Sequence, residues 1–88
     1  MYEPSVFYIM KKLKEGQNID LVLEKVEAEF AEVSGRLTRL EAFNQTDKAK
    51  ELSLQHQAYL IDQERALRVY AEILAKRIDL MRYERIYN

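Results

Sequence analysis

Apolar residues recur at alternating intervals of four and three positions between residues 19 and 40, which is the clearest pattern in the chain. The positions are Ile19, Leu23, Val26, Phe30, Val33, Leu37 and Leu40. This heptad spacing is typical of an α-helix with one apolar seam. Asn18 is a suitable N-cap, and Asp20 suits the positive end of the helix dipole. The pattern predicts a helix over about residues 19–43.

A shorter amphipathic segment precedes this helix. Its apolar side chains are Val6, Phe7, Ile9, Met10 and Leu13. Pro4 fits the first turn of a helix, where its missing N–H has no partner anyway. Gly16 fits the left-handed position that follows a helix C-terminus. We expect a short helix over about residues 4–15.

The third segment contains no glycine or proline from residue 46 onward. Thr46 and Asp47 are suited to cap it, so we predict a helix over about residues 47–87. At 1.5 Å per residue this helix would be roughly 60 Å long, against about 37 Å for the helix before it. A short turn between them makes the two helices antiparallel.

Measured back from the turn, Ile19 is expected to lie opposite about Ala71. Residues 72–88 would then overhang the hairpin, and the segment over residues 4–15 would fold back along them. This arrangement would bring the two ends of the chain together.

The predicted helix over residues 47–87 carries more apolar surface than one partner helix covers. One stripe consists of Leu60, Leu67, Leu74, Ile78 and Met81. A second consists of Leu54, Ala58, Ile61, Ala66, Tyr70, Ile73, Leu80 and Tyr87. An uncovered stripe of this size indicates that another chain covers it. We therefore expect a homo-oligomer.

The composition agrees with an all-α fold. The 88 residues include only two glycines and one proline, and 48% are hydrophobic. We expect one domain over residues 1–88, with a short N-terminal helix followed by an antiparallel two-helix hairpin in an oligomeric assembly. The absence of cysteine excludes disulfides and thiolate metal sites, which leaves oligomerisation as the support for so small a domain.

No catalytic or metal-binding pattern is present in the sequence. His56 is the single histidine, and no nucleophile motif accompanies the serines. Four glutamates lie in the second predicted helix: Glu24, Glu27, Glu29 and Glu32. None is followed by histidine in a Glu-x-x-His unit, so they indicate a solvated acidic face. We expect no enzyme activity, no cofactor and no metal.

The charge is unevenly distributed, although the formal net charge is only −1. Residues 1–14 carry +2, residues 15–64 carry −6 and residues 65–88 carry +3, and five of the six tyrosines lie in the two terminal segments. With no overall basic field, we expect no DNA or RNA partner. No apolar run reaches about 18 residues and no signal peptide is evident, so we expect no membrane contact and a cytoplasmic location.

Aromatic and basic side chains brought together can bind an anion that carries a ring, because rings stack on bases and cations bind phosphates. Tyr8 shares a helix face with Lys11 and Lys12, at i+3 and i+4. Lys25, Arg77 and Arg82 are further candidates, from the same chain or a neighbouring one. The alternative interpretation is that the tyrosines fill an oligomer interface and the arginines pair with acids of their own helix.

The order of elements resembles the small phage anti-CBASS proteins, which are cyclic-oligonucleotide sponges. The resemblance lies in a short aromatic-bearing first helix, a Gly–Asn break, a helix beginning Ile19-Asp20-Leu21, and a two-helix hairpin. The length of 88 residues is also similar to the branch of that family carried by T-even phages. The resemblance implies a helical hexamer in the cytosol of the infected cell. It also implies sequestration, without cleavage, of the cyclic nucleotides that activate bacterial immune effectors.

The resemblance also implies roles for two residues. Tyr8 corresponds to a tyrosine that stacks on a base, and Lys25 corresponds to a lysine that contacts a phosphate. The expected partners are cyclic dinucleotides such as cyclic GMP-AMP. The preferred bases, the existence of a second site for cyclic trinucleotides and the number of subunits stay open. Two other functions also stay open: a structural or adaptor protein, and an inhibitor of a host enzyme, each acting through protein contacts alone.

Overall fold

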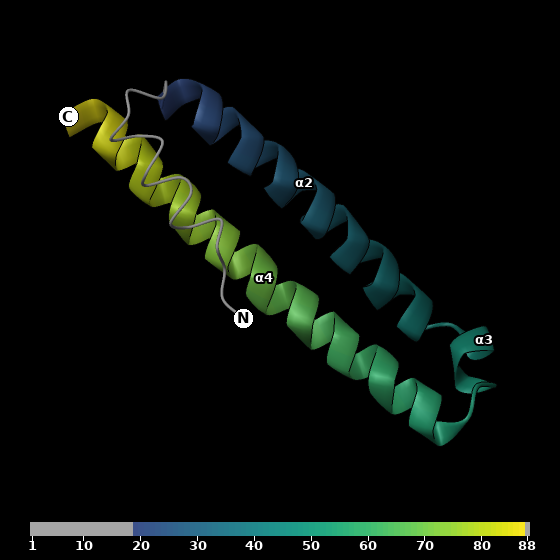
Figure 1. Cartoon of the computed structure of the whole chain (residues 1–88). Helices are drawn as coiled ribbons and strands as arrows, with labels where there is room; N and C mark the ends of the chain where they lie inside the picture. The colour runs from purple at the N-terminus through teal and green to yellow at the C-terminus, as the bar shows by residue number, and fades with distance from the viewer. Residues whose placement is uncertain (1–18, 88) are drawn as a thin grey trace.

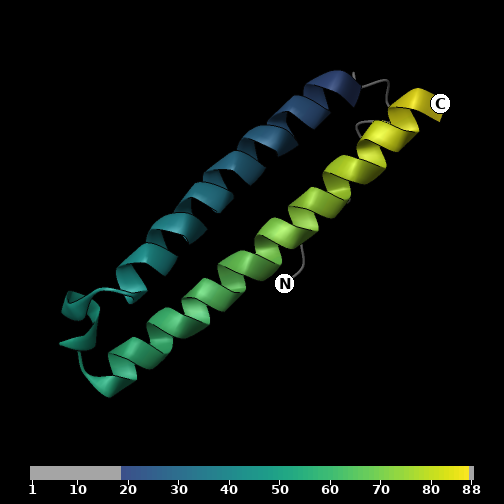
Figure 2. The ribbon, with the colours of Figure 1, turned by 180° about the vertical axis from the view of Figure 1, so that it is seen from behind.

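The computed structural model describes residues 19–87 and contains three helices: α2 (Ile19–Asn44), α3 (Asp47–Lys50) and α4 (Leu54–Tyr87). The two long helices α2 and α4 run antiparallel, with α3 at the end where the chain turns (Figure 1). Seen from behind, they lie side by side along their whole length (Figure 2). The part of the chain that is described contains no strand, which confirms the predicted all-α hairpin. The helix predicted over residues 4–15 lies outside the described residues.

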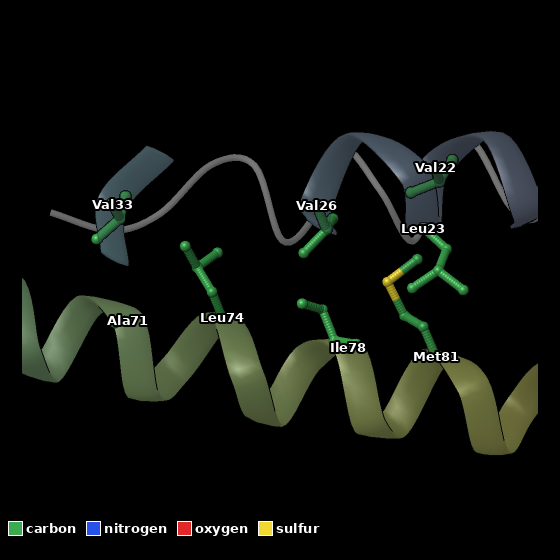
Figure 3. Packing of buried hydrophobic residues seen from close by; sticks show 8 residues of the cluster. All are labelled: Val22, Leu23, Val26, Val33, Ala71, Leu74, Ile78 and Met81. Atoms are coloured by element: carbon green, nitrogen blue, oxygen red, sulfur yellow. The ribbon is translucent and has the colours of Figure 1, made fainter. Parts of the chain in front are cut away.

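The apolar seam of α2 packs against one stripe of α4. The buried cluster comprises Val22, Leu23, Val26 and Val33 of α2 and Ala71, Leu74, Ile78 and Met81 of α4. Figure 3 shows these side chains pointing between the two helices. Leu74 has no exposed surface at all and lies between Val26 and Val33 in this view. Leu60 and Leu67, the remaining members of the predicted first stripe, are half-buried.

The predicted continuous helix over residues 47–87 is wrong, because the chain leaves the helical conformation at residues 51–53. Thr46 caps α3 as predicted, and its hydroxyl accepts a hydrogen bond from the Ala49 backbone N–H at 3.2 Å. Ser53 then accepts the His56 backbone N–H at 3.1 Å and so begins a second helix. The Gln57 amide donates to the Leu52 carbonyl at 2.7 Å, which satisfies a carbonyl in the break.

The predicted overhang of residues 72–88 is also wrong. Because α4 begins at Leu54, its C-terminal half lies beside α2 instead of extending beyond it. Arg85 contacts Asp20 at 3.2 Å, in the first turn of α2. The buried residues Ile78 and Met81 belong to the same cluster as Val22 and Leu23, a register that leaves little of α4 without a neighbour.

The second predicted stripe of α4 is exposed along its described length. Leu54, Ile61, Tyr70, Ile73 and Leu80 are each between 41% and 84% exposed. Val69, at 54%, extends the stripe. An apolar surface of this extent is the feature from which we predicted an oligomer, and that assembly stays a prediction.

Candidate functional site

The buried seam divides the surface of the hairpin into two edges with different chemistry. On one edge, Arg82 contacts Glu27 at 2.7 Å and Arg68 contacts Glu41 at 2.6 Å, so each ion pair joins α4 to α2. We call this the ion-paired edge. On the other, the Tyr70 hydroxyl donates to the Glu29 carboxylate, and we call this the tyrosine edge. Tyr70 and Arg82 are twelve positions apart, or about 120° around the helix at 3.6 residues per turn.

The predicted cationic residues are divided between these edges. Lys25 precedes Glu29 by four residues and Arg77 follows Tyr70 by seven, so both project toward the tyrosine edge. Arg82 lies on the ion-paired edge, where its guanidinium is neutralised by Glu27. The structure therefore brings Lys25 and Arg77 to one side of the hairpin and places Arg82 on the other.

Lys25 and Arg77 also lie at similar heights along the hairpin. Figure 3 shows Val26 facing Ile78 and Leu23 facing Met81, a register that places Lys25 opposite about residue 79, within one turn of Arg77. Lys25 is exposed and Arg77 is half-buried. Within residues 19–87, neither contacts a carboxylate. Two cations without acidic partners at one level can both approach a single polyanion.

Tyr8, Lys11 and Lys12, which complete the predicted ligand-binding set, lie outside the described residues. Their meeting with the C-terminal arginines therefore stays a prediction. Two of the C-terminal arginines already have acidic partners, because Arg82 and Arg85 contact acids of α2. Neither contact is with an acid of the arginine's own helix, which was the alternative considered from the sequence.

Sequence reasoning missed the roles of Glu27 and Glu29. Both were interpreted as part of a solvated acidic face, yet both are half-buried and bind side chains of α4. Glu27 binds Arg82, which is 55 positions later in the chain, and Glu29 binds Tyr70, which is 41 positions later. No local spacing could have indicated these pairs, since they depend on the register of the hairpin. Glu24 and Glu32 are exposed, as expected of a solvated face.

His56 is exposed in the first turn of α4. The described residues hold no group of three histidine or acidic side chains that could bind a metal ion. In the same part of the chain, no helix has the length and apolar character needed to cross a membrane.

The end of the hairpin near α3 is fixed by a polar network. The Asn44 amide donates to the Glu64 carboxylate at 2.9 Å, and the Arg68 guanidinium donates to the same carboxylate at 3.0 Å. Arg68 also donates to Glu41 at 2.6 Å, which closes the network across the two helices. The hydrogen bond from Asn44, followed by that from Arg68, lowers the pKa of the Glu64 carboxyl below its ordinary value.

This network predicts a specific acid sensitivity. A carboxyl whose pKa is lowered in the folded state contributes stability above its unfolded pKa of about 4.3, and that contribution is lost as pH falls through the folded pKa. Glu64→Gln should therefore flatten the dependence of the free energy of unfolding on pH below about pH 5. Urea unfolding followed by circular dichroism between pH 7 and pH 3 measures this. Asp62→Asn, which removes an exposed carboxylate of the same helix, is the control; equal flattening in both variants would contradict the assignment to Glu64.

Comparison with known families identifies the hairpin. The family model called Sequestin matches residues 21–80, which include most of α2, all of α3 and most of α4. The chain belongs to the Sequestin family. Sequestins are phage anti-CBASS proteins that act as cyclic-nucleotide sponges, which confirms the resemblance noted in the sequence. Searches of curated proteins and of solved structures find no match.

The matched region includes Lys25, Glu29, Tyr70 and Arg77 of the tyrosine edge. Sequestins bind cyclic nucleotides and are not known as catalysts. The two cations of the tyrosine edge are thus located on the part of the chain that defines a nucleotide-binding family.

Proposed function

We propose that this sequestin binds cyclic dinucleotides, such as cyclic GMP-AMP, and sequesters them without cleavage. The bound messenger would be withheld from the CBASS effectors of the infected cell, and the protein would act in the host cytoplasm. The family match over residues 21–80 is the observation that carries this proposal.

The described geometry supports a phosphate site on the tyrosine edge. A cyclic dinucleotide carries two phosphates, and Lys25 and Arg77 lie at one level without acidic partners. Tyr8 would stack on a base, and Lys11 and Lys12 would add positive charge beside it. Arg82 would join this site only from another protomer, since in its own chain it contacts Glu27 on the opposite edge.

The exposed stripe of α4 supports assembly into a homo-oligomer, which we propose to be a hexamer. Val69, Ile73 and Leu80 are each at least half exposed in the single chain. Burial of such residues between protomers would stabilise so small a domain. An assembly of this kind would also enclose a ligand between chains, which increases the fraction of its surface that is buried.

Isothermal titration against a panel of cyclic dinucleotides tests the proposal. Saturable heat with at least one of them, and recovery of that nucleotide intact after denaturation of the protein, is the expected result. Protein shown to be folded and oligomeric that gives no heat with any member of the panel would reject it. Salt offers a second check, because binding of a dianion should weaken as ionic strength rises.

The exposed stripe of α4 also favours a second candidate function, that of an adaptor acting through protein contacts alone. Tyr70, Ile73 and Leu80 would then contact a partner protein, as exposed aromatic and aliphatic residues often do at interfaces. Loss of a stoichiometric protein partner on Leu80→Asp, together with no response to any cyclic dinucleotide, would favour this function over sequestration.

A further inference from the structure

The Glu29 carboxylate lies close to both cations of the tyrosine edge. Lys25 is four residues earlier in α2, a spacing at which the side chains of one helix are neighbours. Arg77 of α4 is opposite about residue 27, because Val26 faces Ile78 across the hairpin (Figure 3). Glu29 is therefore within about one turn of both cations and is placed to neutralise either of them.

Neither of these ion pairs forms within residues 19–87. Glu29 instead accepts a hydrogen bond from the Tyr70 hydroxyl. A phenol is an uncharged donor at neutral pH, so this contact satisfies the carboxylate without using a cation. Glu32, the next acid of α2, also has a partner of its own, since it contacts Arg36 at 3.2 Å. The acids of this part of α2 thus leave Lys25 without an ion pair.

The position of Tyr70 draws the Glu29 carboxylate away from Lys25. In the same register, Tyr70 is opposite about residue 34, which is on the α3 side of Glu29. Lys25 is on the other side of Glu29, toward the open end of the hairpin. A Glu29 side chain that reaches the Tyr70 hydroxyl therefore extends along α2 away from the lysine.

We propose that Tyr70 is a positioning residue for anion binding at the tyrosine edge. Its hydroxyl holds Glu29 away from Lys25 and Arg77 and leaves both cations available to the phosphates of a ligand. Without the hydroxyl, the carboxylate would compete with the phosphates for the same cations. This inference rests on the phosphate site proposed above and adds to it a residue that acts through Glu29.

Tyr70→Phe tests the inference, because it removes the hydroxyl and keeps the ring. We expect the Kd for a cyclic dinucleotide, measured by isothermal titration, to rise by about threefold to fivefold, the effect of one exposed ion pair that competes with the ligand. Glu29→Gln removes the competing charge, so Tyr70→Phe should have no further effect in that background. A direct hydrogen bond from Tyr70 to the ligand, or a purely structural role, would weaken binding equally in both backgrounds and would overturn the proposal.

Tyr59→Phe is the matched control. It deletes the same atom from the same helix, and the Tyr59 hydroxyl also takes part in a hydrogen bond, which it accepts from the Gln55 amide at 3.1 Å. Tyr59 is about 16 Å along α4 from Tyr70, far from both cations of the tyrosine edge. This variant should bind as the parent does, and an equal loss in both variants would count against a specific role of Tyr70.

Inorganic pyrophosphate separates this inference from the proposed function, because it offers phosphate charge without a base. NMR of the full-length protein can follow its binding through the Arg77 Nε–Hε signal. We expect a saturable shift in the parent, a higher Kd in Tyr70→Phe, and recovery of the affinity when Glu29→Gln is added. This pattern without binding of any cyclic dinucleotide would reject sequestration and still support the role of Tyr70. No shift in the parent, or an unchanged Kd in Tyr70→Phe, would overturn the inference.

Discussion

Leu74→Ala is expected to lower the free energy of unfolding by about 2–5 kcal/mol. Leu74 is completely buried, at the centre of the contact between α2 and α4, so its truncation removes apolar contacts and leaves a cavity. A typical domain is stable by only about 5–15 kcal/mol, so a loss of this size is a large part of the total. Urea unfolding monitored by circular dichroism measures the change, at one protein concentration because oligomers are stabilised by mass action.

Ile86→Ala is the matched control for this prediction. It removes the same number of carbon atoms from the same helix, but Ile86 is 68% exposed and does not belong to the stripe that we propose to be buried in the oligomer. We expect a change within about 0.5 kcal/mol, as for most surface substitutions. Similar losses in the two variants would show that the buried seam between α2 and α4 is not what stabilises the hairpin.

Lys25→Gln is expected to weaken cyclic-dinucleotide binding by about tenfold or more. A charge-assisted hydrogen bond to a phosphate contributes about 1.5–3 kcal/mol, and each 1.4 kcal/mol corresponds to a factor of ten in Kd. Because Lys25 is exposed and contacts no carboxylate of the described chain, the substitution should leave the free energy of unfolding nearly unchanged. Isothermal titration of the folded variant gives the change in Kd.

Lys48→Gln provides the control, since it removes another exposed lysine, in α3 at the opposite end of the hairpin. It should bind as the parent does, and equal weakening in both variants would indicate a general effect of net charge. Tyr8→Ala should also abolish binding while the oligomer stays intact. Dissociation of the assembly by this substitution would instead assign Tyr8 to a protein interface.

The sequence was sufficient for α2, because its apolar seam and the acid in its first turn are local signals, and the predicted span of 19–43 agrees with Ile19–Asn44. The interruption before α4 was missed because residues 51–53 contain neither glycine nor proline. Its signal was Ser53, a residue that caps helices well but is also common elsewhere. An error of seven residues in the start of α4 then produced an overhang that the structure does not have.

The same error explains why the candidate site was only partly predicted. The residue types on the tyrosine edge were recognised, but whether Arg77 or Arg82 lies beside Lys25 depends on the register and on the side of α4 that faces α2. Local spacing in the sequence determines neither the register of the hairpin nor the side of α4 that faces α2. The cross-helix partners Glu27 and Glu29 were missed for this reason, and the roles of Tyr8, Lys11 and Lys12 stay predictions.

The position of the buried cluster has a consequence for how the chain folds. Its members lie toward the open end of the hairpin, so that Val26 and Ile78, for example, are 52 positions apart in sequence. The chain loses conformational entropy when such distant segments meet, and this loss comes before their packing stabilises the folded hairpin. Contacts near α3 form across shorter loops but are mainly polar and half exposed. This protein should therefore fold more slowly than a helical hairpin whose main hydrophobic contacts adjoin its turn.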